Sequence, residues 1–287
     1  MNLFDYWETW VVIYLVSAVL FAQSFKVANR NMKNANCLTV LLEIFTAFFA
    51  IFFIPFFPVI FPNNISIYLT LLIVTIIYAV TDRLNIESRY GLETSTFSML
   101  KQLSTVFMIF FGFVLLKEPF ESKKLFGAGI IIFSNLLLAY EKGKFSFNKY
   151  FIMCVISNFL FAVAMLINVN ISDNFNLAIY TILTVSVPAL IISVFGRIRP
   201  KMLKDEFSLY NKKAFIIASI SWCLMLISSV RAYQLGNVTV VASLFAVTSI
   251  FNSVIDYIFN KDKRKFFKNL IAALLLIIGV ILVKIRK

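Results

Sequence analysis

Long apolar runs alternate with short polar connections along the chain. A membrane-spanning helix needs about 20 mainly apolar residues, and ten runs approach or exceed this length. They cover residues 7–25, 36–57, 65–81, 93–116, 124–140, 147–168, 176–196, 213–234, 237–259 and 266–284. The connections leave no room for a soluble domain. The pattern therefore predicts an all-α integral membrane protein with ten transmembrane helices.

The two halves of the chain resemble each other after a shift of 145 residues, which superposes residues 68–142 on 213–287 without a gap. We therefore expect two five-helix repeats, residues 1–142 and 147–287. Five is an odd number of crossings, so the second repeat enters the membrane from the opposite side. Two inverted repeats are a common architecture of secondary transporters, in which the substrate site lies between the repeats and access alternates.

Composition supports the membrane assignment and excludes several other classes. The chain is 61% hydrophobic, whereas soluble domains are about 45–50% apolar. The net charge of +13 does not indicate nucleic-acid binding, because the basic residues lie between the apolar runs, as loops facing anionic lipid do. The chain has no histidine, which excludes Ser/His/Asp triads and HExxH zinc sites. No paired intramembrane carboxylates and no Walker A loop are evident, so we expect neither an enzyme nor a cofactor or metal.

Two stretches carry a family likeness: "RYGLETSTFSMLKQLSTVFMIFFGFVLLKEPFESKKLFGAGIIIFSNLLLAY" and "YQLGNVTVVASLFAVTSIFNSV…LIAALLLIIGVILV". They resemble the five-helix unit of EamA-type transporters in the drug/metabolite transporter superfamily. Glu118, Gly127 and Gly129 match the family pattern, whereas Lys263 stands where a second Glu would fall. The resemblance implies both termini in the cytoplasm and a cavity surrounded by helices one to four and six to nine. The fifth and tenth helices would lie outside, as peripheral support or a homodimer contact.

The fourth apolar run carries a charge, Lys101, roughly 12 Å from its start. Glu43 lies at a similar depth in the second run, and both runs start from the same side, so a salt bridge is geometrically allowed. Intramembrane charges usually face the bundle interior or a wet cavity. Three interpretations stay open. The pair is structural, or Lys101 leaves Glu43 for an anionic group of a substrate, or Lys101 reaches the membrane surface without a function.

Further polar and aromatic residues extend this candidate site. Thr94, Ser98 and Lys101 share one helix face because they are spaced four and three residues apart. Tyr78 and Trp222 are candidates to line a cavity, although interfacial belts and packing also explain such aromatic residues. Small residues such as Ser243 equally suit helix packing. The predicted substrate-binding residues are Lys101, Glu43, Ser98, Thr94, Gln102, Tyr78, Trp222, Ser243 and Asn252.

Lys and Arg are unevenly divided between the two sides of the predicted membrane. Nineteen of the 27 follow odd-numbered helices, seven lie on the other side, and Lys101 is the remaining one. The positive-inside rule then places both termini outside, whereas the family resemblance implies both inside. The orientation of the termini stays open.

These observations lead us to expect a transporter in the cell membrane that moves a small polar or amphipathic metabolite, with an anionic group on the substrate as one option. Proton coupling through Glu43 and facilitated exchange both stay open. The alternatives are a multidrug or amino-acid exporter of the same fold and a non-transporting membrane assembly protein. The expected partners are the small-molecule substrate, membrane lipid and, as an option, a second copy of the chain, but no nucleic acid.

Overall fold

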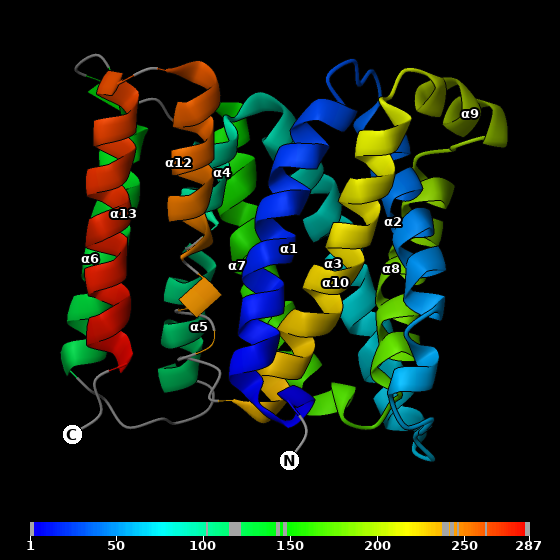
Figure 1. Cartoon of the computed structure of the whole chain (residues 1–287). Helices are drawn as coiled ribbons and strands as arrows, with labels where there is room; N and C mark the ends of the chain where they lie inside the picture. Colours follow the sequence, from blue (N-terminus) through cyan, green and yellow to red (C-terminus); the bar gives the residue numbers. More distant parts are fainter. Residues whose placement is uncertain are drawn as a thin grey trace. The chain divides into compact units, whose positions relative to one another are not determined.

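The computed structural model describes residues 3–101, 103–114, 122–141, 144–145, 148–236, 241, 244–245, 247–261 and 263–284 (Figure 1). Most of them are helical. The α-helices are α1 (Trp7–Ala28), α2 (Ala35–Ile51), α3 (Ile65–Gly91), α4 (Thr94–Leu100), α5 (Leu103–Val114), α6 (Ser122–Ala139), α7 (Lys149–Ser172), α8 (Leu177–Phe195), α9 (Pro200–Ser208), α10 (Lys212–Leu235), α12 (Thr248–Asn260) and α13 (Lys263–Lys284). Two 3-10 helices, η1 (Leu3–Asp5) and η2 (Ile54–Phe56), and a hairpin of β1 (Tyr140–Glu141) and β2 (Lys144–Phe145) complete the elements.

The prediction of a helical chain with long apolar helices is confirmed. Within the described ranges, five helices are long and apolar enough to cross a membrane: Trp7–Ala28, Ile65–Gly91, Lys149–Asn168, Leu177–Phe195 and Lys212–Leu235. Ala35–Ile51, Leu125–Ser134 and Phe266–Gly279 are shorter apolar helices. The count of ten spans and the inversion of the repeats stay predictions.

Three helix boundaries differ from those predicted by the apolar pattern. The expected single helix 93–116 is interrupted, because α4 ends at Leu100 and α5 begins at Leu103. Helix α3 continues to Gly91 instead of ending at residue 81, since polar side chains of its last turns, such as Asn85, are buried against protein. Helix α2 ends at Ile51 instead of residue 57, because a longer helix would need a bond from the amide of residue 55 to the carbonyl of Ile51, and Pro55 has no N–H.

The chain forms two compact units, and each unit draws helices from both predicted repeats. Unit 1 comprises Met1–Glu87 and Ala164–Leu235, and unit 2 comprises Ser88–Val163 and Gly236–Lys287. Unit 1 therefore contains α1, α2, α8, α9, α10, most of α3 and the end of α7. Unit 2 contains α4, α5, α6, α12, α13 and the beginning of α7. The division of the sequence into repeats 1–142 and 147–287 stays a prediction.

In unit 1, helices α2 and α8 pack against each other, and they run in opposite directions because the start of α8 is bonded to the residues that follow α2. Asn176 precedes α8, and its Oδ1 accepts bonds from the amides of Ala178 and Ile179 at 3.0 and 3.1 Å. Its Nδ2 donates to the carbonyls of Ile54 and Phe57, just beyond the end of α2, at 3.1 and 2.7 Å. One asparagine thus satisfies the free amides that begin α8 and fastens this helix to the end of α2.

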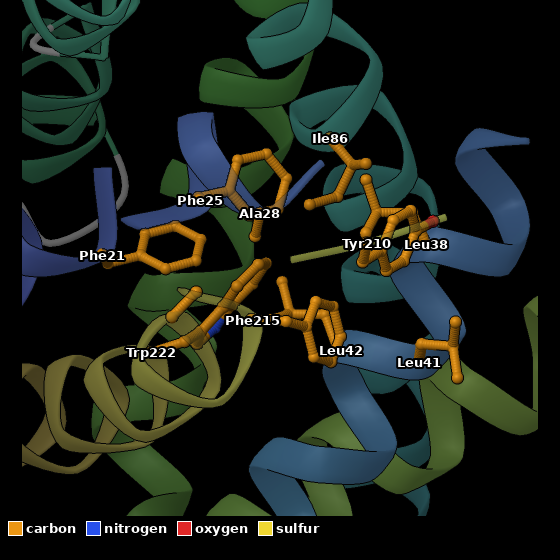
Figure 2. Packing of buried hydrophobic residues seen from close by; sticks show 11 residues of the cluster. Phe21, Phe25, Ala28, Leu38, Leu41, Leu42, Ile86, Tyr210, Phe215 and Trp222 are labelled. Atoms are coloured by element: carbon orange, nitrogen blue, oxygen red, sulfur yellow. The ribbon is translucent and has the colours of Figure 1, made fainter. Parts of the chain in front are cut away.

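The hydrophobic core of unit 1 joins α1, α2, α3 and α10 (Figure 2). Trp222 packs edge-on against Phe21, with ring centroids 4.7 Å apart. Phe215 is fully buried and stacks with Tyr210 at 5.5 Å. These large rings occupy the centre of the unit, whereas large side chains such as Leu20 and Phe48 are exposed on its outside, as expected for helices that face lipid.

In unit 2, α6 packs against α13 and α4 packs against α12. The hydroxyl of Ser134 donates to the carbonyl of Ala272 at 2.6 Å, so α6 and α13 approach closely. Gly91 permits another close approach: a Cβ built there would lie 2.2 Å from the ring of Tyr150. By contrast, a Cβ at Gly129 on α6 would meet nothing within 4 Å.

Candidate functional site

Glu43 is the most deeply buried charged side chain in the part of the chain that the structure describes. It lies on α2 and is 1% exposed. Neither of its carboxylate oxygens has a hydrogen-bond partner among the described residues. Burying an ionised carboxylate without a partner is strongly unfavourable. This side chain therefore needs a proton or a cation in order to occupy its position.

The structure adds a second carboxylate, Asp82, to this position. Asp82 lies on α3 within electrostatic reach of Glu43, and the two helices meet where Val40 packs with Ala79. The sequence made no carboxylate pair evident, because the apolar pattern placed residue 82 beyond the end of the third helix. Two neighbouring carboxylates repel in a low dielectric, and one bound proton relieves this repulsion.

Tyr78 connects this pair to the other helices of unit 1. It lies one turn before Asp82 on α3, and its hydroxyl accepts a bond from Nδ2 of Asn168 on α7 at 2.8 Å. Tyr180 on α8 and Tyr233 on α10 lie within electrostatic reach of Tyr78. We call Glu43, Tyr78, Asp82, Asn168, Tyr180 and Tyr233 the polar cluster; its members come from five helices of unit 1.

Several polar atoms of unit 1 have no hydrogen-bond partner among the described residues. Besides both oxygens of Glu43, they include the hydroxyl of Tyr180, Oδ1 of Asn168 and Nε1 of Trp222. Buried polar groups are normally bonded to protein or to ordered water. These unpartnered acceptors and donors lie on four helices. They could form hydrogen bonds with a water molecule or with a polar part of a substrate.

Trp222 has a structural role in the core of unit 1, one of the interpretations that the sequence left open. It is 5% exposed and belongs to the core cluster of Figure 2. Nearby on the same helix, the carbonyl of Ser219 accepts a bond from Thr46 of α2 at 3.5 Å. The ring of Trp222 thus packs in the core, which agrees with the packing interpretation. Its indole N–H has no hydrogen-bond partner among the described residues.

In unit 2, the break between α4 and α5 exposes backbone groups that side chains then satisfy. The carbonyl of Leu100 accepts a bond from Nδ2 of Asn158 on α7 at 2.9 Å. The carbonyl of Lys101 accepts a bond from the hydroxyl of Ser104 at 2.6 Å. Broken helices at membrane depth are tolerated where neighbouring side chains replace the lost helix bonds. Discontinuous helices also form the substrate sites of many secondary transporters.

Lys101 lies at this break, and its side chain is half-buried. Its ammonium lies over the ring of Phe161 on α7, 4.1 Å from the ring centroid. A cation over an aromatic face is stabilised by the ring quadrupole. Glu43 belongs to unit 1 and Lys101 to unit 2. The salt bridge between them therefore stays a prediction.

The remaining predicted site residues are distributed as follows. Thr94 is buried at the first residue of α4, and Asn252 is buried on α12. Ser98 lies on α4, but its side chain is outside the described part, as are Gln102 and Ser243 altogether. The structure thus brings Glu43, Tyr78 and Trp222 into unit 1, and places Lys101, Thr94 and Asn252 in unit 2.

Asp82, Asn168 and Tyr180 were missed by the sequence interpretation. Asp82 follows Tyr78 by four residues, a spacing that puts both on one helix face, and this is the signal that could have found it. Asn168 and Tyr180 lie near the ends of their apolar runs, where polar residues are ordinary, so no comparable signal marks them. The described residues contain no group of three or more His, Cys, Asp or Glu side chains that could hold a metal ion.

Known families and structures can now be compared with this arrangement. Residues 8–140 match the model of the EamA-like transporter family. This part of the chain is EamA-like. The resemblance that the sequence indicated is thereby confirmed, and EamA-like proteins are membrane transporters of the drug/metabolite type. The match contains Glu43, Tyr78, Asp82 and Lys101 within one family unit.

Comparison with solved structures extends over nearly the whole chain. A crystal structure of another protein, 11% identical in sequence, superposes with a TM-score of 0.66 and covers 96% of this chain and 98% of its own. At this identity the likeness concerns the fold alone. No curated protein matches the chain.

Proposed function

We propose that this protein is a secondary transporter that moves a small polar or amphipathic metabolite across the cell membrane by alternating access. The observation that carries the proposal is Glu43, a buried carboxylate without a hydrogen-bond partner among the described residues. A purely structural helix contact has no use for such a group. A transporter uses it to take up a proton or a cationic group on one side and to release it on the other.

The second carboxylate, Asp82, gives a physical reason why Glu43 would take up and release a proton. With Asp82 in electrostatic reach, Glu43 holds a proton when the site is empty, because that proton removes the repulsion between the two groups. A cationic substrate group, or water admitted when the site opens, releases the proton again. Proton coupling is therefore the form of transport that we favour over facilitated exchange.

The break at Lys101 supports the same function from unit 2. Its half-buried ammonium and the broken backbone beside it are suited to an anionic group. The ring of Phe161 lies against this ammonium and stabilises it as a cation. An anionic substrate group then draws Lys101 away from this ring. Substrates that carry both a cationic and an anionic group, as amino acids do, would use both features.

Uptake into liposomes tests the proposal. The full chain is reconstituted, and separate pools of radiolabelled amino acids, nucleotide sugars and organic cations are offered outside, each with an unlabelled excess of the same pool inside. We expect uptake above that of protein-free liposomes for at least one pool. When the unlabelled pool inside is replaced by a proton gradient, wild type should accumulate that pool and Glu43→Gln should not. Glu8→Gln is the matched control, because Glu8 is exposed. The proposal is wrong if folded wild-type protein transports none of the pools.

A further inference from the structure

The connection between α8 and α10 concentrates exposed positive charge at one end of unit 1. Residues 194–213 include six basic side chains, all of them exposed: Arg197, Arg199, Lys201, Lys204, Lys212 and Lys213. The same stretch has two acidic residues. Of these, Asp205 is exposed, whereas Glu206 is 5% exposed and already bonded within the protein. We call this stretch the basic segment. Its surface is strongly cationic.

The basic segment is held in place by several bonds. The carboxylate of Glu206 accepts bonds from the backbone amide of Lys33, at 2.8 Å, and from the hydroxyl of Tyr210, at 2.9 Å. The amide of Asn211 donates to the carbonyl of Ala28 at the end of α1, at 3.2 Å. Phe207 packs against Phe45 of α2 with ring centroids 5.4 Å apart. The charges are therefore presented as a fixed array.

Exposed apolar side chains beside the basic segment indicate where it lies relative to the membrane surface. Val194 and Phe195 form the last turn of α8 and are 72% and 85% exposed. Helix α8 is long and apolar enough to cross a membrane, so its last turn lies near the membrane surface. In Figure 1, α9 lies across the end of unit 1 instead of running along the other helices of the unit. Exposed apolar side chains directly beside a row of cations are typical of elements that contact the headgroup region.

We propose that the basic segment binds the anionic headgroups of one membrane leaflet. Charge complementarity identifies the partner: a phospholipid with net negative charge attracts six fixed cations, whereas a zwitterionic phospholipid does not. Val194 and Phe195 meanwhile insert among the upper acyl chains. The anionic leaflet is the cytoplasmic one, so the proposal also directs this end of unit 1 to the cytoplasm.

Thermal unfolding of the full-length protein in a neutral detergent tests the proposal. The probes are phosphatidylglycerol, phosphatidylcholine with the same acyl chains, and inorganic phosphate at the same concentration. A ligand that binds the folded state raises its melting temperature. We expect phosphatidylglycerol to raise it by several degrees more than phosphatidylcholine, and 0.5 M salt to remove most of the difference, because salt at this concentration screens charges beyond roughly 4–5 Å.

The variant Arg199→Gln/Lys201→Gln/Lys204→Gln should lose most of the phosphatidylglycerol effect while it keeps the melting temperature measured without lipid. The control Lys123→Gln/Arg231→Gln/Lys284→Gln removes three cations that the sequence places on the opposite side of the membrane, and it should keep the effect. Glu206→Ala releases α9 without changing any cation and should weaken the effect.

Three results would overturn the proposal. Phosphatidylcholine could stabilise the protein as much as phosphatidylglycerol does, which would show that charge is irrelevant. The triple variant of the basic segment could keep the full effect. Inorganic phosphate could reproduce the effect, which would assign the segment to a free anion instead of a lipid surface. If the triple variant fails to fold, Arg199→Gln and Lys204→Gln are measured singly, and an unchanged lipid effect in both contradicts the proposal.

Discussion

At the scale of single residues, Glu43 and Lys101 are the two intramembrane charges on which the account depends. Glu43 is enclosed by protein and has no hydrogen-bond partner among the described residues, whereas Lys101 is half-buried and lies on an aromatic ring. A carboxylate in this state is suited to bind a proton, and a lysine in this state is suited to bind an anion. The proposed function gives the two charges separate tasks and requires no permanent pair between them.

The double variant Glu43→Gln/Lys101→Met separates these tasks from a structural pair. If the two residues only stabilise each other, removing one strands the other and costs about 3–5 kcal/mol, and removing both restores folding and transport. We expect the double variant to fold but to fail in transport. The measurement is exchange of a transported pool in liposomes, with melting temperature as the check on folding. Near-normal exchange by the double variant would end the functional role of Lys101.

Tyr210 provides a residue-scale prediction about pH. Burial raises its pKa above the usual value, and the neighbouring Glu206 carboxylate raises the pKa further by repelling the phenolate. The folded state therefore holds the proton more strongly than the unfolded chain, whose tyrosine pKa is about 10. The resulting stability is present below about pH 10 and is lost as pH rises above it.

Tyr210→Phe should consequently make the melting temperature less sensitive to alkaline pH. At neutral pH the variant loses the bond to Glu206 and should be destabilised by about 1–3 kcal/mol. The measurement is the melting temperature between pH 7 and 11 for the variant and the wild type. Parallel curves for the two proteins would show that Tyr210 does not titrate differently in the folded state.

At the scale of elements, the close approach of α3 to α7 depends on Gly91. A Cβ at this position would lie 2.2 Å from the Tyr150 ring, whereas a Cβ at Gly129 on α6 would meet no atom within 4 Å. Gly91→Ala should destabilise the protein by about 1–3 kcal/mol, because the ring cannot move away without disturbing α7. Gly129→Ala should be neutral or stabilising by up to about 1 kcal/mol, because alanine favours helix.

Chemical denaturation in mixed micelles measures both glycine variants under the same conditions. The pair is matched, since each variant adds one methyl group to a helix. Equal stability of the two variants would show that the contact between Gly91 and Tyr150 is not tight.

The sequence predicted helical elements well and their interruptions poorly. Apolar runs locate α1, α7, α8 and α10 because a bilayer demands about 20 apolar residues whatever the neighbours are. The break after Leu100 could not be predicted, because it depends on Asn158, distant in sequence, which satisfies the freed carbonyl. The position of Asp82 in α3 was missed for a similar reason: its neighbourhood is polar in sequence, yet the neighbouring Thr81, Asn85 and Ser88 are buried in the structure.

The candidate site was also predicted only in part, because single residues are visible in the sequence whereas contacts between helices are not. Glu43 stood out because a charge inside an apolar run is expensive and therefore rare. The group beside it belongs to another helix, so the spacing of residues along α2 says nothing about it. Trp222 was predicted to line a cavity, with interfacial belts and packing as alternatives, and only the contact with Phe21 shows that its ring packs in the core.

At the scale of the whole molecule, helix pairing supports the expected repeat. A shift of 145 residues carries the start of α5, Leu103, onto the start of α12, Thr248. Within the units, α2 packs against α8, α4 against α12 and α6 against α13. The pairs α2–α8 and α6–α13 each join an element to its expected repeat mate, as a two-fold axis between two repeats would, whereas α4 packs against α12, the expected mate of α5. The opposite directions of α2 and α8 further favour an axis in the membrane plane.

The central claim is that Glu43 couples transport to protons, and substrate-driven proton movement tests it most directly. Liposomes containing the protein and a pH-sensitive dye inside are mixed with a transported metabolite at equal pH on both sides. We predict a change of internal pH with wild type and with Glu8→Gln. With Glu43→Gln we predict no pH change, although metabolite exchange continues. A pH change of wild-type size in Glu43→Gln would contradict the account.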